Sequence, residues 1–439
     1  MVARANLNRT GVELETRLQR LATGMRINRG ADDPAGLIIS ERLRSDVRGN
    51  EQAIKNSERA SSVIATAEGS LAEVGDLLNS IRALIVEAAN TGANSAEERR
   101  ANQLQIDSAI DSITRISNTA SFGGLKLLNG SMDYTLSGIN AAQVARAQVF
   151  GASFIGTNRL QVNVDVLGSA QTGALFYRDT TFPTGVVAST IVLRVAGNRG
   201  VTEVTITSGT TMTNFVQAIN TYTQLTGVRA ELINPSDPTS GVVMRAAEYG
   251  SNDFVSVERL GGPSNPSLSS FRTYAIRNNE TPPATFDWAS MLSSGVLTAA
   301  VRDAGKDVTA LVNGTLATGQ GLRISVNSQA LSLQLLLTES AATRPDVDVT
   351  PFFITGGGAL FQLGPSVTAQ QQTNVGIQSI AASSLGGTLI NGSLEFLSSL
   401  KDGQKNSLAE SFKRNDYSNA SAILDRALDE ISVIRGRRR

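Results

Sequence analysis

Two helical seams near the ends of the chain constrain its fold more than any other feature. Over residues 53–88, small or apolar side chains recur in unbroken steps of four and three. This is the period of a helix that lays one stripe along a partner helix. A shorter seam with the same rhythm runs over residues 420–434. We therefore expect the two ends to pack together as helices.

The first seam lies in a stretch that predicts one long helix from residue 34 to residue 90. Asp32 and Asp33 precede Pro34, and proline suits the first turn of a helix because its missing N–H costs nothing there. Gly49, Gly69 and Gly75 weaken this helix locally.

After a break at 91–94, Ser95 and Glu98 form a capping-box pattern that starts a second helix. The short break favours an antiparallel hairpin. The residues expected in the helical core are Ile64, Leu71, Val74, Leu78, Ile81, Ile85, Ile106, Ile110, Ile113, Leu424, Ile431 and Ile434.

The middle of the chain has the pattern of β-structure. Apolar and polar residues alternate over 160–166, 191–195, 322–326 and 331–337, between clusters of Gly, Asn, Pro and Ser. Alternation with a period of two is typical of half-buried antiparallel strands. One helix is expected over 212–222, and a short strand closed by an Asn-Gly turn over 122–130. A proline-containing loop is expected over 261–283, and a return to helix over 370–372 and 377–385.

These patterns predict an α+β, multidomain fold. We expect a long antiparallel α-helical rod formed by both termini, with an inserted β-rich outer region. The expected limits are 1–33 for a partial terminal helix and spoke segment, 34–135 for the first half of the rod, 136–268 and 269–358 for two parts of the insert, and 359–439 for the second half of the rod.

Composition excludes several classes of function. The 439 residues include no histidine and no cysteine, which removes the commonest general base, thiol nucleophiles and the usual zinc ligands. Lys+Arg and Asp+Glu balance at 39 each, so no net charge attracts nucleic acid. No apolar run approaches the roughly 20 residues that span a membrane, and the first residues lack the apolar core of a secretory signal. We expect no catalysis, no cofactor, no metal and no membrane insertion.

Several distant motifs resemble the terminal regions of bacterial flagellins. Near the start these are RLATGMRIN at 20–28, DDPAG at 32–36, RISN at 115–118 and FGGLKLLNG at 122–130. Near the end they are FQLG at 361–364, QQQTNVGI at 370–377 and ISVIRGR at 431–437. The stretch 248–257 is similar to the β-insert of some flagellins. The motifs follow the family order and cover nearly the whole chain.

The resemblance implies a structural role. Flagellins leave the cell through the flagellar type III export route and polymerise through their terminal helices into the extracellular filament that drives swimming. The implied partners are other copies of the chain, an export chaperone and the filament cap protein. A hook–filament junction protein is the alternative, because that related family has similar terminal helices. An enzyme carried in the insert is rejected, since a zinc-protease helix of the His-Glu-x-x-His type needs histidine.

The chain also departs from the flagellin pattern in two respects. Flagellins have a further run before Val2 and another helix after the Arg-Gly-Arg motif, so we expect a chain trimmed at both ends, and a monomer. The family's contacts with an animal innate immune receptor align with Ser80, Leu84 and Gln105, and only the leucine matches. Weak receptor activation is therefore expected.

Other residues have competing interpretations. The apolar side of the 53–88 seam is expected to be an internal core, and its flanking charges (Arg42, Arg44, Arg48 and Glu51) to be candidates for contact between subunits or plain surface. Asp32 and Asp33 fit a helix start better than a cation site. Asp346 and Asp348 are weak cation candidates. The basic end at 435–439 is interpreted as a helix continuation rather than a nucleic-acid tag.

Overall fold

The computed structural model describes residues 1–31, 33–90, 94–154, 159–178, 185–261, 271–276, 286–328, 330–344, 348–390, 392–414 and 416–436. Expectations for Asp32, Asp346, the break at 91–93, most of the 261–283 loop and the basic residues 437–439 lie outside these ranges. The chain forms two compact units, each described by itself below. Unit 1 comprises Met1–Ala65 and Leu360–Asn374, and unit 2 comprises Thr66–Ala359 and Val375–Arg439.

Unit 1 is built from helix and one small hairpin. Helix α1 (Val2–Thr23) ends at Gly24, which has the left-handed φ of 67° that glycine adopts without strain. Helix α2 (Pro34–Ala89) begins where expected and contributes its first half to this unit. Strands β21 (Ala359–Gln362) and β22 (Gln372–Val375) pair as a two-stranded sheet, joined through the 3-10 turn η3 (Ala369–Gln371).

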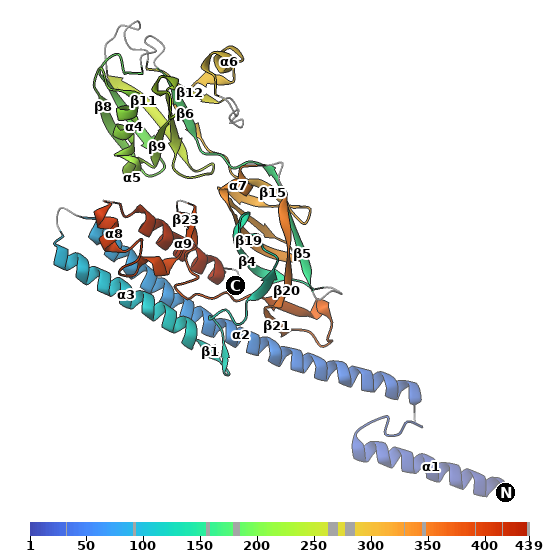
Figure 1. The fold of residues 1–439 in the computed structure, drawn as a ribbon. Helices are drawn as coiled ribbons and strands as arrows, with labels where there is room; N and C mark the ends of the chain where they lie inside the picture. The colour runs from blue at the N-terminus through green and yellow to red at the C-terminus, as the bar shows by residue number, and fades with distance from the viewer. Residues whose placement is uncertain are drawn as a thin grey trace. The chain divides into compact units, whose positions relative to one another are not determined.

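The helical part of unit 2 contains the rest of α2 together with short and long helices. Helix α3 (Ala96–Thr119) starts with the predicted capping box, in which Ser95 and Glu98 satisfy each other's backbone N–H groups. Towards the end of the chain come η4 (Leu397–Leu400), α8 (Leu408–Lys413) and α9 (Ser418–Gly436). Helix α8 lies beside α3 (Figure 1), and η4 packs on α3 as well. An ion pair of 2.9 Å joins Arg82 of α2 to Asp425 of α9.

Two local predictions near this helical part are wrong. The 122–130 segment forms a hairpin of β1 (Ser121–Phe122) and β2 (Leu125–Lys126), closed by Gly123 and Gly124 rather than by an Asn-Gly turn. Both glycines have positive φ, which explains why they close it. Residues 377–385 form no helix but a bridge and turns, because backbone N–H groups such as those of Ile377 and Ile380 bond to Met132 and Leu128 instead. A further hairpin, β23 (Thr388–Ile390) with β24 (Ser393–Glu395), follows this segment.

The first β module, called the enclosing module, consists of residues 134–170 and 306–357. One sheet has the strand order β16-β15-β5-β20-β3 and the other β17-β18-β19-β4, with antiparallel pairing throughout. Their inward side chains, such as Val162, Leu333 and Phe352, are fully buried in a shared core. The elements are β3 (Tyr134–Ser137), β4 (Val144–Ala152), β5 (Leu160–Gly168), β15 (Thr309–Val312), β16 (Thr315–Leu316), β17 (Thr318–Gln320), β18 (Arg323–Asn327), β19 (Leu331–Leu337), α7 (Glu339–Ala342) and β20 (Val349–Gly357).

The second module, called the nested module, comprises residues 174–304. Its sheets have the orders β13-β12-β6-β10-β9 and β14-β11-β7-β8. The predicted helix is α4, and its Phe215 and Ile219 are buried in the core. The elements are β6 (Ala174–Tyr177), β7 (Ile191–Gly197), β8 (Val201–Ile206), α4 (Met212–Asn220), α5 (Thr223–Thr226), β9 (Val228–Leu232), η1 (Pro238–Ser240), β10 (Val242–Ala246), β11 (Phe254–Gly261), β12 (Thr273–Ile276), α6 (Trp288–Ser293), β13 (Leu297–Ala299) and β14 (Arg302–Ala304).

Strand pairing does not follow the expected division of the insert at 268/269. Strand β5, from before that position, pairs with β15 and β20 from after it. Strand β12, from after it, pairs with β6 from before it. The nested module is therefore inserted between β5 and β15 of the enclosing module (Figure 1). The other expected limits stay predictions.

Within the described part of the chain, no helix combines the length and the apolar character that crossing a bilayer requires.

Candidate assembly surface

Helix α1 presents an apolar stripe to solvent. Leu7, Leu14, Leu18 and Leu21 recur at helical spacing and are 76%, 58%, 56% and 82% exposed. No side chain of α1 is buried. A helix normally buries such a stripe against another surface, since apolar area left in water costs about 25 cal/mol per Å². We call these four residues the α1 stripe.

The first half of α2 has a second stripe of the same kind. Ile39, Leu43, Val47 and Ile54 are 59%, 59%, 55% and 61% exposed. Their spacing of four, four and seven residues places them along one side of the helix. Unit 1 therefore exposes two apolar helix faces, the kind of surface that marks an interaction site. We call these residues the α2 stripe.

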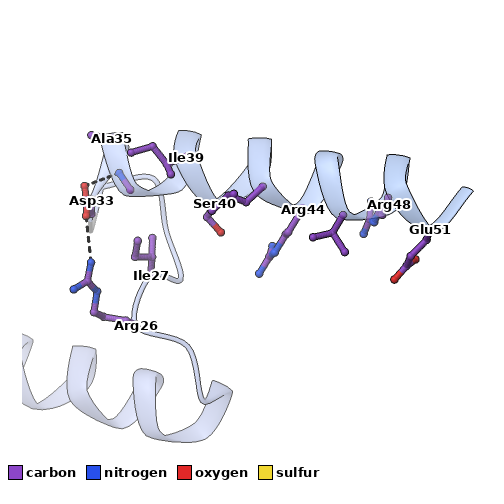
Figure 2. Close-up of a pocket in the computed structure, with 12 residues that line it drawn as sticks. Arg26, Ile27, Asp33, Ala35, Ile39, Ser40, Arg44, Arg48 and Glu51 are labelled. Carbon is purple, nitrogen blue, oxygen red and sulfur yellow. Dashed lines mark hydrogen bonds and ion pairs between the residues drawn. The ribbon is translucent and has the colours of Figure 1, made fainter. Parts of the chain in front are cut away.

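A pocket of about 950 Å³ lies along the α2 stripe. Leu43 and Val47 of α2 line it. The charged Arg44, Arg48 and Glu51, also on α2, line it too (Figure 2). Arg44 is oriented by Glu41, its guanidinium lying 2.9 Å from that carboxylate. The structure thus brings three of the four charged candidates to one pocket, whereas Arg42 is not among its lining residues.

The start of α2 forms one end of this pocket. The Asp33 carboxylate accepts a hydrogen bond of 2.9 Å from the backbone N–H of Gly36, and the Arg26 guanidinium lies 3.7 Å from it (Figure 2). This is the arrangement of a helix start, in which a carboxylate satisfies a free N–H at the positive end of the helix dipole. Among the described residues, no three acidic side chains are placed to hold a metal ion.

Gly49 allows the β21–β22 hairpin to approach α2. A side-chain carbon added at Gly49 would lie 2.9 Å from Cβ of Pro365, in the loop between the two strands. Gly69 and Gly75, in contrast, have no neighbour within 4 Å of that position. A glycine inside an otherwise regular helix is the sequence signal for such a close approach, but it does not identify the neighbour.

The predicted seam residues differ in burial along the helices. Ile64 is half-buried and Ser57 is exposed, whereas every seam position of α2 from Ala67 onward is buried. The α3 and α9 seam residues are also buried, at 0–1% and 1–9% exposure respectively. Those buried are Leu71, Val74, Leu78, Ile81, Ile85, Ile106, Ile110, Ile113, Leu424, Ile431 and Ile434.

Two polar residues in this helical part were not assigned a role from the sequence. The side-chain amide of Gln103, on the apolar face of α3, donates to the carbonyl of Leu400 at 2.9 Å and accepts from the N–H of Leu408 at 2.8 Å. Glu430 of α9 is 4% exposed and lies between Arg146 and Arg426. Its position next to the seam residue Ile431 was the only signal in the sequence.

The three receptor-aligned positions lie on two helices. Ser80 of α2 and Gln105 of α3 are exposed, and Leu84 is half-buried. The Ser80 hydroxyl donates back to the carbonyl of Asp76, one turn earlier. Arg82 is held by Asp425 of α9, so its charge is already paired. Weak receptor activation stays a prediction.

Comparison with known proteins agrees with the geometry of this helical region. Residues 1–133 match the family model of the bacterial flagellin N-terminal helical region. The chain is 38% identical to the flagellin of Bacillus subtilis over 159 residues, which is 36% of this chain and 51% of that protein. It is 43% identical to flagellin B of Vibrio cholerae over 131 residues, or 30% of this chain and 35% of that protein.

Similar values hold for the B-type flagellin of Pseudomonas aeruginosa, with 45% identity over 130 residues, 30% of this chain and 26% of that protein. The D1-D2-D3 domains of the flagellar cap protein FliD from Escherichia coli align at 16% identity and a TM-score of 0.31, covering 57% of this chain and 63% of that one.

Residues 1–133 are therefore similar to the N-terminal helical region of bacterial flagellins. The chain spans about half the length of the Bacillus relative and about a third or less of the other two.

Proposed function

We propose that this protein is the structural subunit of a bacterial flagellar filament, which polymerises to form the propeller for swimming. The observation that carries the proposal is the pair of exposed apolar stripes in a region that matches the flagellin N-terminal helical region. A subunit that assembles through its helices needs such faces exposed before assembly and covered after it.

The two stripes supply the assembly energy in this proposal. Burying an exposed leucine or valine side chain is worth about 1.5–3 kcal/mol, so several residues per stripe give a stable contact between copies. The charged rim of the α2 pocket would then select the register of the partner, since like charges brought together oppose a wrong alignment. The seam residues of α2, α3 and α9 hold the subunit's own helices together as an antiparallel rod.

The same proposal sets the location and partners of the protein. The subunit acts outside the cell in the flagellum, after export by the flagellar type III route. Its partners are further copies of itself, an export chaperone and the cap protein at the growing tip. It needs no cofactor and catalyses no reaction. Both β modules belong to the surface of the filament, as part of the insert between the terminal helices.

Immunogold electron microscopy on cells that produce the protein tests this function. An antibody raised against residues 140–355 should label the filament along its whole length, because every subunit presents its β modules there. Label at the filament base alone would assign the protein to the hook–filament junction. Absence of label on any appendage, with the protein detected in the same cells by immunoblot, would refute both assignments.

A further inference from the structure

The chain enters the nested module at Gln171 and leaves it at Lys306, and these two segments pack tightly against each other rather than forming free linkers. We call this contact the crossing. Where the chain enters and leaves the nested module, Gln171 and Lys306 exchange two backbone hydrogen bonds of 2.9 Å. Gly305 packs so closely here that an added side-chain carbon would lie 2.3 Å from the carbonyl oxygen of Gln171. The two crossing segments therefore hold each other, and a third segment reinforces them.

That third segment is the 247–253 loop of the nested module, between β10 and β11. Ser251 bonds to the Asp307 carboxylate of the enclosing module twice, through its N–H at 3.1 Å and its hydroxyl at 2.5 Å. The Tyr249 hydroxyl donates to the Glu339 carboxylate on α7 of the enclosing module. The N–H of Gly250 bonds to the carbonyl of Gln171 at 3.2 Å. One loop thus contacts the enclosing module at Asp307 and Glu339, and the connecting segment at Gln171.

Asp253 ends this loop and is buried at the crossing. It is 9% exposed, its N–H bonds to the carbonyl of Gly250 at 3.1 Å, and its own carbonyl accepts from the N–H of Gly305 at 2.8 Å. The side-chain amide of Asn198 donates to its carboxylate. Asp253 therefore fixes the loop to the crossing from within the nested module.

The charges that face Asp253 are mostly of its own sign. Glu248 on the loop and Asp307 on the enclosing module repel its ionised form, and Arg199 on the β7–β8 turn stabilises it. Arg199 is itself engaged by Glu248 at 2.8 Å. Burial first, and then the Glu248 charge, raise the pKa of Asp253 to about 6. The Asp253 carboxyl therefore changes its charge near pH 6.

We propose that the 247–253 loop is a proton-controlled clasp that fixes the nested module against the enclosing module when Asp253 is neutral and loosens when Asp253 is ionised. The neutral carboxyl removes the repulsion from Glu248 and Asp307 and still accepts the hydrogen bond from Asn198. The bonds of Ser251 and Tyr249 then keep the loop on the enclosing module. This device does not depend on the filament role, because it acts within one chain.

The raised pKa of Asp253 determines how closure of the clasp depends on pH. Burial at the crossing and the Asp307 charge of the enclosing module both raise the pKa of Asp253. Opening of the crossing would weaken both effects, so in this proposal the closed clasp binds the proton more tightly. Closure therefore strengthens as the pH falls through about 6. The pKa of Asp307 is shifted in the opposite direction. Burial raises this pKa, but the hydrogen bonds from Ser251 and Gly321 outweigh burial and lower it. Asp307 therefore stays ionised through this pH range.

Distance measurements between the modules test the clasp. The chain contains no cysteine, so Thr205→Cys on β8 and Thr315→Cys on β16 place one spin label on each module. Double electron–electron resonance should give a narrow distance distribution at pH 5 and a broader one at pH 7.5, with the change centred near pH 6. Asp253→Asn, which mimics the neutral carboxyl, should give the narrow distribution at both pH values.

Two further variants separate the clasp from general effects. Glu258→Gln removes an exposed carboxylate farther along β11 and should leave the pH response of the parent unchanged. Ser251→Ala should broaden the distribution at pH 5, since it removes the hydroxyl bond to Asp307. Fluorescence of Trp288, the sole tryptophan and part of the nested core, reports whether each variant is folded. A pH-independent distribution in the parent chain, or the same pH response in Asp253→Asn, would overturn the proposal.

Discussion

At the scale of single residues, Glu430 shows how one buried charge ties distant segments together. Its carboxylate pairs with Arg146 on β4, lies 3.2 Å from Arg426 on its own helix, and accepts a bond of 3.0 Å from the N–H of Gly386. Arg146 also donates to the carbonyl of Ser384. One side chain of α9 thereby connects the enclosing module and the turn before β23 with the helical part of unit 2.

Glu430→Gln should destabilise unit 2 by about 3 kcal/mol, because breaking a buried ion pair leaves uncompensated buried charge. Urea unfolding of the purified protein followed by circular dichroism measures this loss. Asp425→Asn is the matched control on the same helix. Its pair with Arg82 is half exposed, so a change below about 1 kcal/mol is expected. Equal losses in both variants would show that Glu430 has no special role.

At the scale of elements, α3 is held to the following segments by its buried polar face as well as by its isoleucines. Ile106, Ile110 and Ile113 are 0–1% exposed, and Gln103 lies one turn before them. The Gln103 amide satisfies one carbonyl of η4 and one N–H at the start of α8. Buried backbone groups need a hydrogen-bond partner, and the Gln103 amide is the partner of both. The contact of α3 with η4 and α8 therefore depends on this side chain.

Gln103→Leu should cost about 2 kcal/mol or more in the free energy of unfolding, since it leaves a buried carbonyl and a buried N–H without a partner. Hydrogen–deuterium exchange should show the loss first at the N–H of Leu408 and along α8. Leu104→Gln, at the neighbouring exposed position, is the control and should leave exchange at α8 unchanged. Undisturbed protection of α8 in Gln103→Leu would contradict the role assigned to Gln103.

Periodicity sufficed to predict elements whose defining pattern lies within their own residues. The bounds of α2, the capping box of α3 and the alternating strands follow from residue spacing and from side chains within a few positions. The helix expected at 377–385 was wrong because its backbone bonds to residues some 250 positions earlier. The roles of Gln103 and Glu430 were missed for the same reason, since each depends on a partner about 300 residues away.

At the scale of the whole molecule, the nested arrangement of the β modules follows from strand pairing that sequence alternation does not encode. Alternation identifies β5 and β15 as strands but not as neighbours, because 140 residues lie between the end of β5 and the start of β15. The exposed stripes of unit 1 were likewise not singled out, because a helix seam looks the same whether its partner belongs to the same chain or to another copy.

Filament assembly by variants of the α1 stripe tests the central claim most directly. Cells whose only copy of the protein carries Leu14→Glu and Leu18→Glu should export the variant but form no long filaments, since charge replaces apolar area at the contact. Thr16→Glu and Thr23→Glu, on the other side of the same helix, should still give filaments by electron microscopy. Filaments of normal length from the Leu14→Glu, Leu18→Glu variant would contradict assembly through the α1 stripe.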